Sequence, residues 1–321
     1  MQTDVIASVL RAVRLSGAVF FDVAATGPWV AEAPPGHELA ARIMPRAQNL
    51  MEYHVVVSGS CWAALTVAPE AAVRLEAGSI IVFPHGDSHV MASRPGLRAP
   101  PDYSVYRLPE SGETLPFPVA LNAGASAGAN LICGFLGCDA RPFNPLLAAL
   151  PPLLHVAGAY GDSSLGHLIH AAIDESRSAR IGSEDVVSRL SELIFIEVIR
   201  RYVENLPPAA SGWLTALGDP HIGRVLKLLH DEPGYAWTLD VLARRSGLSR
   251  TRLVEQFSAQ LGMAPMTYLT RWRMQMAASL LANGQLSIAR VAAQVGYASQ
   301  AAFSRAFSRC LGVPPAMWRK Q

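Results

Sequence analysis

One residue pattern occurs twice near the C-terminal end of this 321-residue chain. Each copy starts with Ser, continues with apolar residues at every fourth position, and ends with Gly and, three residues later, Pro. The copies lie fifty positions apart, at residues 249–265 and 299–315. Ser caps helix N-termini, side chains four residues apart share a helix face, and Gly followed by Pro ends a helix. Each copy therefore predicts an amphipathic helix, and the chain must accommodate a repeated helical unit.

A shorter helical pattern precedes each copy, at residues 238–247 and 287–296. Both have a small Ala four residues before a closing Gly, where two closely crossing helices leave no room for a larger side chain. A short helix, a glycine turn and a longer helix predict a helix-turn-helix unit. A plain helical hairpin is the alternative, which the second copy in register disfavours. We call the longer helix of each unit its recognition helix.

The segment between the units, residues 266–282, also has helical spacing. It predicts one continuous helix, roughly 25 Å long at about 1.5 Å per residue. Such a spacer would hold the two recognition helices in the same direction, about one turn of DNA apart.

Charge is distributed unevenly along the chain. From Trp213 onward there are 13 Lys and Arg against 5 Asp and Glu, a net charge of +8, whereas the remainder carries −6. A basic helical domain predicts a phosphate backbone as its partner. A solvated basic face is the alternative, which is weakened because the charges lie on and beside the repeated helices.

The cysteines and apolar segments indicate the compartment. The cysteines are scattered without disulfide-type clustering, and Cys133 and Cys138 are expected to be buried thiols rather than half of a zinc site. Charges interrupt the first apolar stretch, so no signal peptide is apparent. The uncharged segment 115–138 contains Pro, Asn and Gly, which favours strands over a membrane span. We expect a soluble cytoplasmic protein without a membrane partner.

Short β-prone runs separated by Pro and Gly fill the region from about residue 15 to 143. These runs include 53–57, 61–67, 79–83, 89–92 and 103–108. Many short strands at close spacing predict a sandwich or barrel. Helices are expected before this region at 4–14, and after it, within about 163–205, at 163–177 and 183–205. The predicted fold class is α+β: a β-barrel domain with trailing helices, then an all-α domain.

The domain boundaries follow from these patterns. We expect a barrel and dimerisation domain at 1–206, a Pro-containing linker at 207–216 and the double helix-turn-helix domain at 217–321. The apolar stripe of the second trailing helix is wider than packing on one neighbour requires. It predicts either packing inside the domain or a helix-to-helix interface of a homodimer.

Two motifs in the β-rich region resemble those of the cupin barrels. The second cupin motif is similar to Gly78-x5-Pro84-x-Gly86-x2-His89-x3-Ser93, although its last position is usually Asn. The end of the first cupin motif is similar to Glu52-x6-Gly59. The cupin histidine commonly binds a metal, but the histidine pair expected just before Glu52 is absent here. A metal site usually needs three or four ligands, so we expect no metal and no other cofactor.

Four polar residues are candidates for an effector-binding pocket inside the barrel. Glu52 and His54 share one strand face by alternation, although that face could be turned toward the interior or toward solvent. His89, at a strand start, is more often a structural residue than a ligand. The candidate set is Glu52, His54, His85 and His89.

The paired units resemble the DNA-binding domain of the AraC/XylS family of bacterial transcription regulators. The resemblance rests on Gly296-Tyr297-x-Ser299-x3-Phe303-Ser304-Arg305-x-Phe307 and then Gly312-Val313-x-Pro315-x2-Trp318-Arg319. The N-terminal two-thirds resembles the cupin-type regulatory domain of one branch of that family, along 131–155 and 84–89. The resemblance implies a dimeric regulator of promoter or operator DNA, controlled by a small-molecule effector in the barrel, with RNA polymerase as a further partner.

The resemblance also assigns DNA contacts to residues early in each recognition helix. They are Arg250, Thr251, Arg252, Val254 and Glu255 in the first unit, and Gln300, Ala301, Ser304 and Arg305 in the second. Gln can pair with adenine, Arg with guanine or phosphate, and Glu can accept from cytosine. Glu255 stands where the family often has a basic residue, so the first unit is expected to bind more weakly or to read another base. Arg252, Arg271 and Arg273 are expected to contact phosphate or to support the fold.

Three functions are compatible with these patterns. The first is an effector-responsive transcription regulator without catalysis. The second is a cupin metalloenzyme fused to a DNA-binding module, which stoichiometric metal held through dialysis would favour. The third is a regulator whose barrel binds no small molecule and responds to a protein partner.

Overall fold

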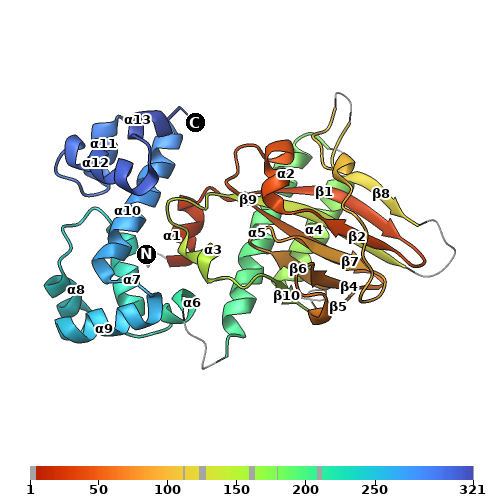
Figure 1. The fold of residues 1–321 in the computed structure, drawn as a ribbon, viewed down its shortest axis with the longest axis horizontal. Coiled ribbons are helices and arrows are strands. Elements are labelled where there is room, and N and C mark those ends of the chain that lie inside the picture. The colour runs from red at the N-terminus through yellow and green to blue at the C-terminus, as the bar shows by residue number, and fades with distance from the viewer. Residues whose placement is uncertain are drawn as a thin grey trace. The chain divides into compact units, whose positions relative to one another are not determined.

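The computed structural model describes residues 5–110, 113–122, 128–158, 163–178, 180–207 and 212–320. The chain forms two compact units (Figure 1). The sheet unit comprises Leu15–Cys138 and Leu150–Asn205, and the helical unit comprises Met1–Arg14, Asp139–Ala149 and Leu206–Gln321. The units therefore differ from the linear division expected from the sequence, because residues 5–14 and 139–149 pack with the C-terminal helices.

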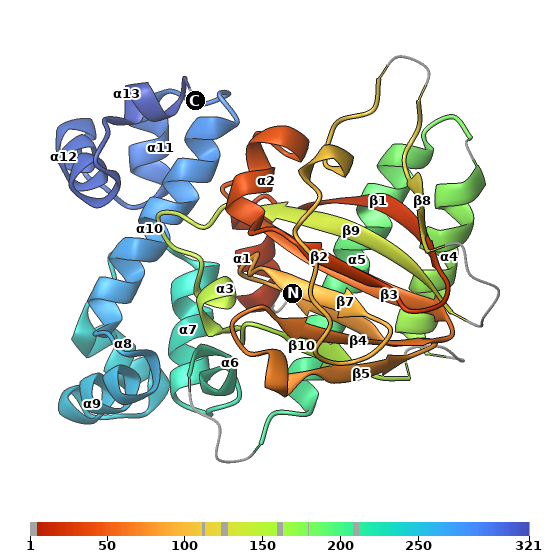
Figure 2. The same ribbon diagram turned by 45° about the vertical axis from the view of Figure 1, so that its right-hand side comes forward.

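Two sheets face each other across the core of the sheet unit (Figure 2). The six-stranded sheet has the order β10 (Leu154–Val156), β6 (Ile80–Phe83), β3 (Asn49–Ser58), β9 (Ala129–Cys138), β1 (Ser16–Ala25) and β8 (Phe117–Leu121). The four-stranded sheet has the order β2 (Val30–Ala33), β7 (His89–Ala92), β4 (Ser60–Leu65) and β5 (Val73–Glu76). Neighbouring strands are antiparallel except for the parallel pair β1 and β8. The predicted β-rich domain, expected to be a sandwich or a barrel, is confirmed, and its strands form two facing sheets that do not close into one barrel.

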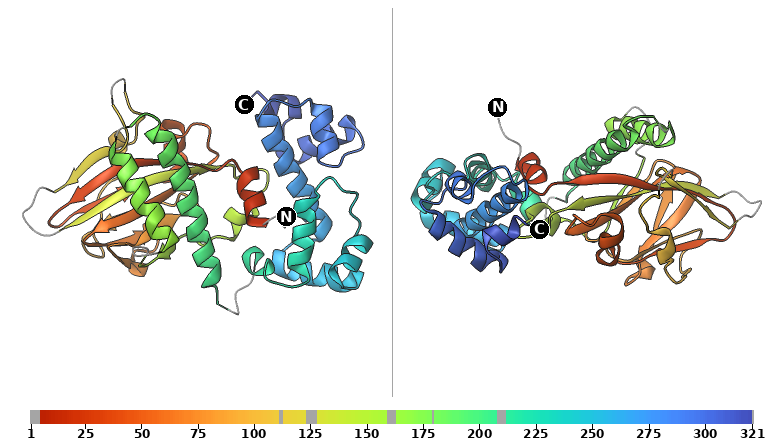
Figure 3. Two further views of the ribbon diagram at one scale, coloured as in Figure 1. Left: turned by 180° about the vertical axis from the view of Figure 1, so that it is seen from behind. Right: turned by 90° about the horizontal axis from the view of Figure 1, so that it is seen from above.

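Two helices, α4 (Ser164–Ser178) and α5 (Ser183–Glu204), cover the outer face of the six-stranded sheet (Figure 3). β3 is therefore buried on both faces along most of its length. Gly17 allows α5 to approach β1 closely, since a Cβ atom there would lie 2.6 Å from the Cβ atom of Ser191. The Ser191 hydroxyl also forms a 2.9 Å hydrogen bond with the hydroxyl of Tyr53 on β3. These contacts fix the helix layer against β1 and β3.

Three local predictions were wrong or incomplete. The run 103–108 contains a 3-10 turn, η2 (Tyr103–Val105), instead of a strand, because the Asp102 carboxylate accepts a hydrogen bond from the backbone N–H of Ser104. The chain re-enters the sheet as β10 after residue 143, where the barrel was expected to end. Helix α2 (Gly36–Ile43) was not predicted. A further short turn, η1 (Pro69–Ala71), precedes β5.

The helical unit contains α1 (Val5–Ala12), α3 (Pro145–Ala149), α6 (Trp213–Ala216), α7 (Ile222–Asp231), α8 (Leu239–Ser246), α9 (Arg250–Leu261), α10 (Pro265–Ala282), α11 (Ile288–Gln294), α12 (Gln300–Leu311) and α13 (Pro315–Trp318). The predicted spacer helix is confirmed as α10, which starts with Pro265 in its first turn. Part of the predicted linker is helical, since α6 buries Trp213. No helix within the described ranges has the length and apolar character needed to cross a membrane.

A buried chain of hydrogen bonds fastens α1 to α7 and α10. The indole N–H of Trp213 donates to the Tyr268 hydroxyl over 2.7 Å, and that hydroxyl lies 2.8 Å from Nε2 of His230. Nδ1 of His230 lies 2.6 Å from the Ser8 hydroxyl, which itself donates to the carbonyl of Val5. Every donor in this series of hydrogen bonds has one acceptor when His230 is neutral, with its proton on Nδ1.

A second contact joins two segments that are remote in sequence, those containing Ala12 and Phe143, to α10. The side-chain amide of Gln275 donates to the carbonyl of Ala12 over 3.1 Å, and its oxygen accepts from the backbone N–H of Phe143 over 3.1 Å. Gln275 is fully buried, so both of these bonds replace solvation that the amide has lost. The segments 5–14 and 139–149 are therefore structural parts of the helical unit.

The buried His230 predicts an acid-sensitive helical unit. Burial lowers the pKa of His230 to about 3, whereas an unfolded histidine titrates near its ordinary value of 6.5. As pH falls from about 6.5 towards 3, the unfolded state binds a proton that the folded state does not, so the free energy of unfolding falls by up to about 1.4 kcal/mol per pH unit. Urea titrations followed by tryptophan fluorescence at pH 7, 6 and 5 would measure this slope.

The variant His230→Gln cannot titrate and should show a shallower pH dependence than the wild type. His85→Gln, which changes an exposed histidine of the sheet unit, is the control and should keep the wild-type slope. Equal slopes in the wild type and His230→Gln would contradict this account.

Candidate nucleic-acid interface and ligand pocket

The first helix-turn-helix unit consists of α8, a glycine turn and α9. The Thr238 hydroxyl caps α8 by accepting from the N–H of Val241, and the Ser249 hydroxyl caps α9 by accepting from the N–H of Arg252. Gly247 between them has a φ of 74°, which glycine adopts without strain. The predicted cap and the predicted turn are both confirmed. On α9, Leu253 and Phe257 are fully buried, which fixes the face of the helix that points outward.

The second unit, α11 and α12, repeats this construction. The hydroxyls of Ser287 and Ser299 cap α11 and α12, and Phe303 and Phe307 form the buried stripe of α12. Gly296 in the turn has a φ of 81°, and a Cβ atom there would lie 2.7 Å from both the carbonyl oxygen of Gly234 and Nη2 of Arg273. Only glycine fits this position without moving its neighbours.

Helix α10 joins the two helix-turn-helix units, with α8 and α9 at one end and α11 and α12 at the other (Figures 1 and 2). Towards the first unit it buries Tyr268, whose ring contacts Phe257 with centroids 5.7 Å apart. Towards the second unit it contributes Met274, Ala277 and Leu281 to a core that includes Phe303 and Phe307. One rigid helix thus belongs to both cores.

Arginine and tryptophan side chains reinforce these junctions. Arg273 donates to the carbonyls of Pro233 and Tyr235, so it supports the fold, one of the two roles expected for it. The indole N–H of Trp318 donates to the carbonyl of Ala278 over 3.1 Å, and Arg319 donates to the carbonyl of Leu286. Trp318 therefore ties the end of the second helix-turn-helix unit to α10, and Arg319 ties it to the segment between α10 and α11.

The predicted DNA-contact residues lie on the outward faces of the two recognition helices. Arg250, Thr251, Arg252 and Glu255 are exposed on α9; on α12, Gln300, Ala301 and Arg305 are exposed and Ser304 is half-buried. The nearest opposite charge to Arg250 is Asp240 at 3.9 Å, a loose and exposed pair that leaves the guanidinium available. The predicted contact residues of α9 and α12 thus lie at matching positions, on the side of each helix away from its buried stripe.

Sequence reasoning missed the residue that orients α9. The Asp219 carboxylate accepts hydrogen bonds from the backbone N–H groups of His221 and Ile222, and from the side-chain amides of Gln256 and Gln260 on α9. Burial opposes ionisation of Asp219, but these four hydrogen bonds lower its pKa. An Asp three residues before a helical pattern is a recognisable capping signal, whereas its bonds to α9 join residues 37 and 41 positions apart.

A cavity of about 370 Å³, which we call the sheet pocket, lies between the two sheets. Its walls are mostly apolar and include Phe21, Trp29, Met91, Tyr106, Leu131 and Phe135. The rings of Phe21, Tyr106 and Phe135 contact one another edge to face. Concave, largely apolar cavities with a few polar groups are typical of small-molecule sites.

Three polar residues lie together in the sheet pocket: Glu52, His54 and His89. Nε2 of His54 lies 2.8 Å from Nε2 of His89, which lies 3.7 Å from Oε2 of Glu52. His89 is fully buried, and its ring stacks on Phe83 with centroids 3.7 Å apart. Glu52 and His54 are exposed by only 2% and 7%, so the strand face that carries them is turned inward.

Burial favours the uncharged form of all three groups. It raises the pKa of the Glu52 carboxyl to about 8 and lowers the pKa of His89 to about 4. Burial, with the neighbouring His89, also lowers the pKa of His54. Oε1 of Glu52 and Nδ1 of His54 are buried without a hydrogen-bond partner, which is costly for polar atoms. The oxygen and nitrogen atoms of Glu52, His54 and His89 could therefore bind an additional ligand or a cation.

His85 does not belong to this set. Its side chain is exposed, it lies outside the lining of the sheet pocket, and its Nε2 forms a 3.0 Å hydrogen bond with the carbonyl of Leu150. The positive φ of Gly86 turns the chain between His85 and His89, so the two side chains point in different directions. The effector-binding assignment of His85 is corrected accordingly.

The cysteines are free thiols. Cys133 lines the sheet pocket, Cys61 and Cys138 are buried, and Cys310 is exposed. Burial raises the pKa of Cys61 to about 12 and also raises that of Cys133, so neither is a ready thiolate. The prediction of buried thiols at Cys133 and Cys138 is confirmed.

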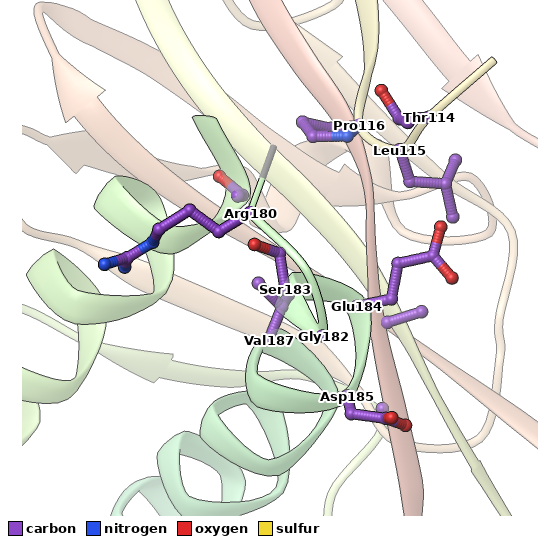
Figure 4. Close-up of a pocket in the computed structure, with 12 residues that line it drawn as sticks. Thr114, Leu115, Pro116, Arg180, Gly182, Ser183, Glu184, Asp185 and Val187 are labelled. Carbon is purple, nitrogen blue, oxygen red and sulfur yellow. The ribbon is translucent and has the colours of Figure 1, made fainter. Parts of the chain in front are cut away.

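A second cavity of about 450 Å³ lies where residues 114–116 and the start of β1 meet the N-terminal end of α5 (Figure 4). Figure 4 shows the Arg180 side chain turned away from Leu115 and Pro116. Arg180 pairs with Glu175, and the first turn of α5 carries Glu184 and Asp185. Among the described residues, the buried polar atoms without a hydrogen-bond partner lie elsewhere. The sheet pocket is therefore the better candidate for a ligand site.

Comparison with known proteins agrees with this architecture. Residues 4–204 match the cupin family model, and residues 242–321 match a helix-turn-helix domain model. An AraC-like transcription regulator of Streptomyces lividans is 37% identical over 199 residues, which cover 62% of this chain and 66% of that protein. The regulator AlkR of Acinetobacter baylyi is 27% identical over 278 residues, covering 86% and 89%. The activator RclR of Escherichia coli is 30% identical over 196 residues, covering 60% and 68%.

Two helix-turn-helix units on one connecting helix, attached to a cupin domain, define a class of DNA-binding transcription regulators. The chain belongs to the AraC-type regulators with an N-terminal cupin domain, and the predicted family resemblance is confirmed. The chain spans somewhat less than two thirds of the length of the Streptomyces relatives that it matches.

The opposite charges of Arg305 and Glu255 predict unequal contributions from the two recognition helices. At about 100° per residue, Arg305 faces away from Phe303 and Phe307, on the same side of the helix as Ala301. A guanidinium attracts phosphate and can bind guanine bidentately, whereas the Glu255 carboxylate repels phosphate. Arg305→Ala should therefore cost about 1–3 kcal/mol of DNA-binding free energy, and Glu255→Ala less. Fluorescence anisotropy with one native operator at fixed salt would measure both.

Arg309→Ala is the matched control, because Arg309 is an exposed residue in the last turn of the same helix. It should change affinity less than Arg305→Ala. A greater loss in Glu255→Ala than in Arg305→Ala would mean that the first unit is the principal reader.

Proposed function

We propose that this protein regulates transcription by binding promoter DNA through both recognition helices, and that a small molecule in the sheet pocket controls this binding. The observation that carries the proposal is the pair of capped recognition helices. Both present polar residues outward from equivalent buried stripes, and both are held by α10. Side chains near the start of such helices reach base edges in the major groove.

Charge complementarity supports DNA as the partner. The +8 excess lies from Trp213 onward, within the unit that contains both recognition helices. The predicted contact set on α12 combines Gln300, suited to adenine, with Arg305, suited to guanine or phosphate. On α9, Arg250 and Arg252 supply phosphate contacts, and Glu255 accepts from cytosine.

Chain connectivity supports control by a pocket ligand. Phe21 on β1 and Phe135 on β9 line the sheet pocket. The same strands continue in the chain directly into residues 5–14 and 139–149, which belong to the helical unit. Ala12 and Phe143 in those segments both hydrogen-bond Gln275 on α10. A ligand that shifts β1 against β9 would therefore act on the helix that sets both recognition helices.

A homodimer completes the proposal. Val186 and Leu193 are each 46% exposed on α5, with the half-buried Leu190 between them on the same face. That face is distinct from the one buried on β1, so an exposed apolar stripe is available for a second copy. We infer a cytoplasmic regulator without catalytic activity, with RNA polymerase as its further partner at the promoter. The relatives above, all named as regulators, support this inference.

DNA binding by the full-length protein should depend steeply on salt. Each phosphate neutralised by Lys or Arg releases counterions, so six to ten contacts would lower affinity about 10³–10⁵-fold between 50 and 200 mM salt. Anisotropy titrations at four salt concentrations, with the native upstream region and with a scrambled duplex, would measure slope and specificity.

Arg94→Ala, which removes an exposed charge of the sheet unit, should leave the slope unchanged. The proposal fails if affinity is independent of salt, or if native and scrambled duplexes bind equally.

A further inference from the structure

Three potential metal-ligand side chains converge inside the sheet pocket. Glu52 and His54 project from β3 of the six-stranded sheet, and His89 projects from β7 of the four-stranded sheet. One donor atom from each lies within 4.8 Å of the other two. Two ligand atoms bound to one ion at about 2.1 Å lie about 3–3.4 Å apart. The 2.8 Å separation of the two Nε2 atoms is therefore close to a chelating arrangement and needs only a small opening.

The surroundings of His89 orient its free nitrogen into this cluster. Nδ1 of His89 donates to the carbonyl of Asp87 over 3.0 Å, which places the lone pair of the neutral ring on Nε2. A ring N–H held by a backbone carbonyl is the usual support of a metal-bound histidine. Stacking on Phe83 further fixes the ring.

The unpartnered polar atoms of the cluster favour a cation as its ligand. Oε1 of Glu52, on a residue only 2% exposed, has no hydrogen-bond partner, and neither has Nδ1 of His54. With the His89 proton on Nδ1, Nε2–H of His54 donates to Nε2 of His89, which leaves Nδ1 of His54 and Oε1 of Glu52 as buried acceptors without a donor. A divalent ion instead accepts lone pairs from all three side chains at once.

We propose that Glu52, His54 and His89 bind one divalent first-row transition-metal ion inside the sheet pocket. Two imidazoles and one carboxylate suit iron(II), zinc, manganese or cobalt. The ligand set differs from the cupin motif to which the sequence was compared, because the histidine pair before Glu52 is absent and His54, two residues after it, supplies the third ligand. With three protein ligands, the ion keeps open positions toward the apolar part of the sheet pocket.

This inference extends the pocket half of the proposed function and is independent of DNA binding. A metal held among β3, β7 and the apolar walls would give the regulatory molecule a coordination point. If the site takes up no metal, the DNA-binding proposal stands unchanged, since the two measurements share no readout.

Metal binding by the full-length protein tests the proposal. The protein would be stripped with a chelator, dialysed with Zn²⁺, Mn²⁺ or Co²⁺, or anaerobically with Fe²⁺, and dialysed again before elemental analysis. We expect about one ion per chain for at least one metal, and a rise in melting temperature on loading. Visible absorption of the Co²⁺ form would report nitrogen and oxygen ligation.

Glu52→Gln and His54→Gln replace ligands with side chains of similar size, and each should weaken metal binding at least about tenfold. His85→Gln is the matched control, since His85 lies outside the pocket lining, and it should bind like the wild type. Thermal unfolding of the metal-free variants would verify that they fold. Less than a tenth of an ion per chain for every metal, or equal binding by folded Glu52→Gln and His54→Gln, would overturn the assignment.

Discussion

The helical unit depends on one constraint: α10 must be buried at both ends at once. Tyr268 packs in the first helix-turn-helix core and Leu281 in the second, so neither core can form correctly with the helix bent or shifted. The remaining contacts build on this helix. Trp318 and Arg319 fasten the second unit at its far end, while His230 and Gln275 hold the remote segments 5–14 and 139–149. Loss of a buried contact here would alter the spacing of two recognition helices, because they share a single support.

The sheet unit has the opposite character, since its core contains a cavity and polar groups that packing does not satisfy. An apolar core normally excludes a carboxyl with an unpaired oxygen, because each buried unsatisfied polar atom costs about 1–3 kcal/mol. We therefore infer that a bound ligand or ion offsets the cost of clustering Glu52, His54 and His89. In the proposed regulator, binding in this pocket would act on strands β1 and β9, which line the pocket and continue in the chain into the helical unit.

The parts that sequence predicted are those fixed by local spacing. Ser249 and Ser299 cap their helices, Gly247 takes the positive φ, and Phe303 and Phe307 are buried, because neighbours within one or two turns decide these features. Non-local contacts were missed. The pairing of Glu52 with Phe83 and of His54 with Ile81 turns both side chains inward, and no local pattern sets this register. The bond between Ser8 and His230 spans 222 positions, so the packing of α1 with the C-terminal helices was equally hidden.

In the proposed function, both recognition helices read DNA from one rigid support. Methylation interference on the native operator measures this most directly, because methylation of guanine N7 blocks major-groove contacts. One bound protomer should show interference in two segments on the same face of the duplex, with centres about 10 base pairs apart. Arg305→Ala should weaken one segment and leave the other. Interference confined to a single segment, or two segments lost together in Arg305→Ala, would contradict the account.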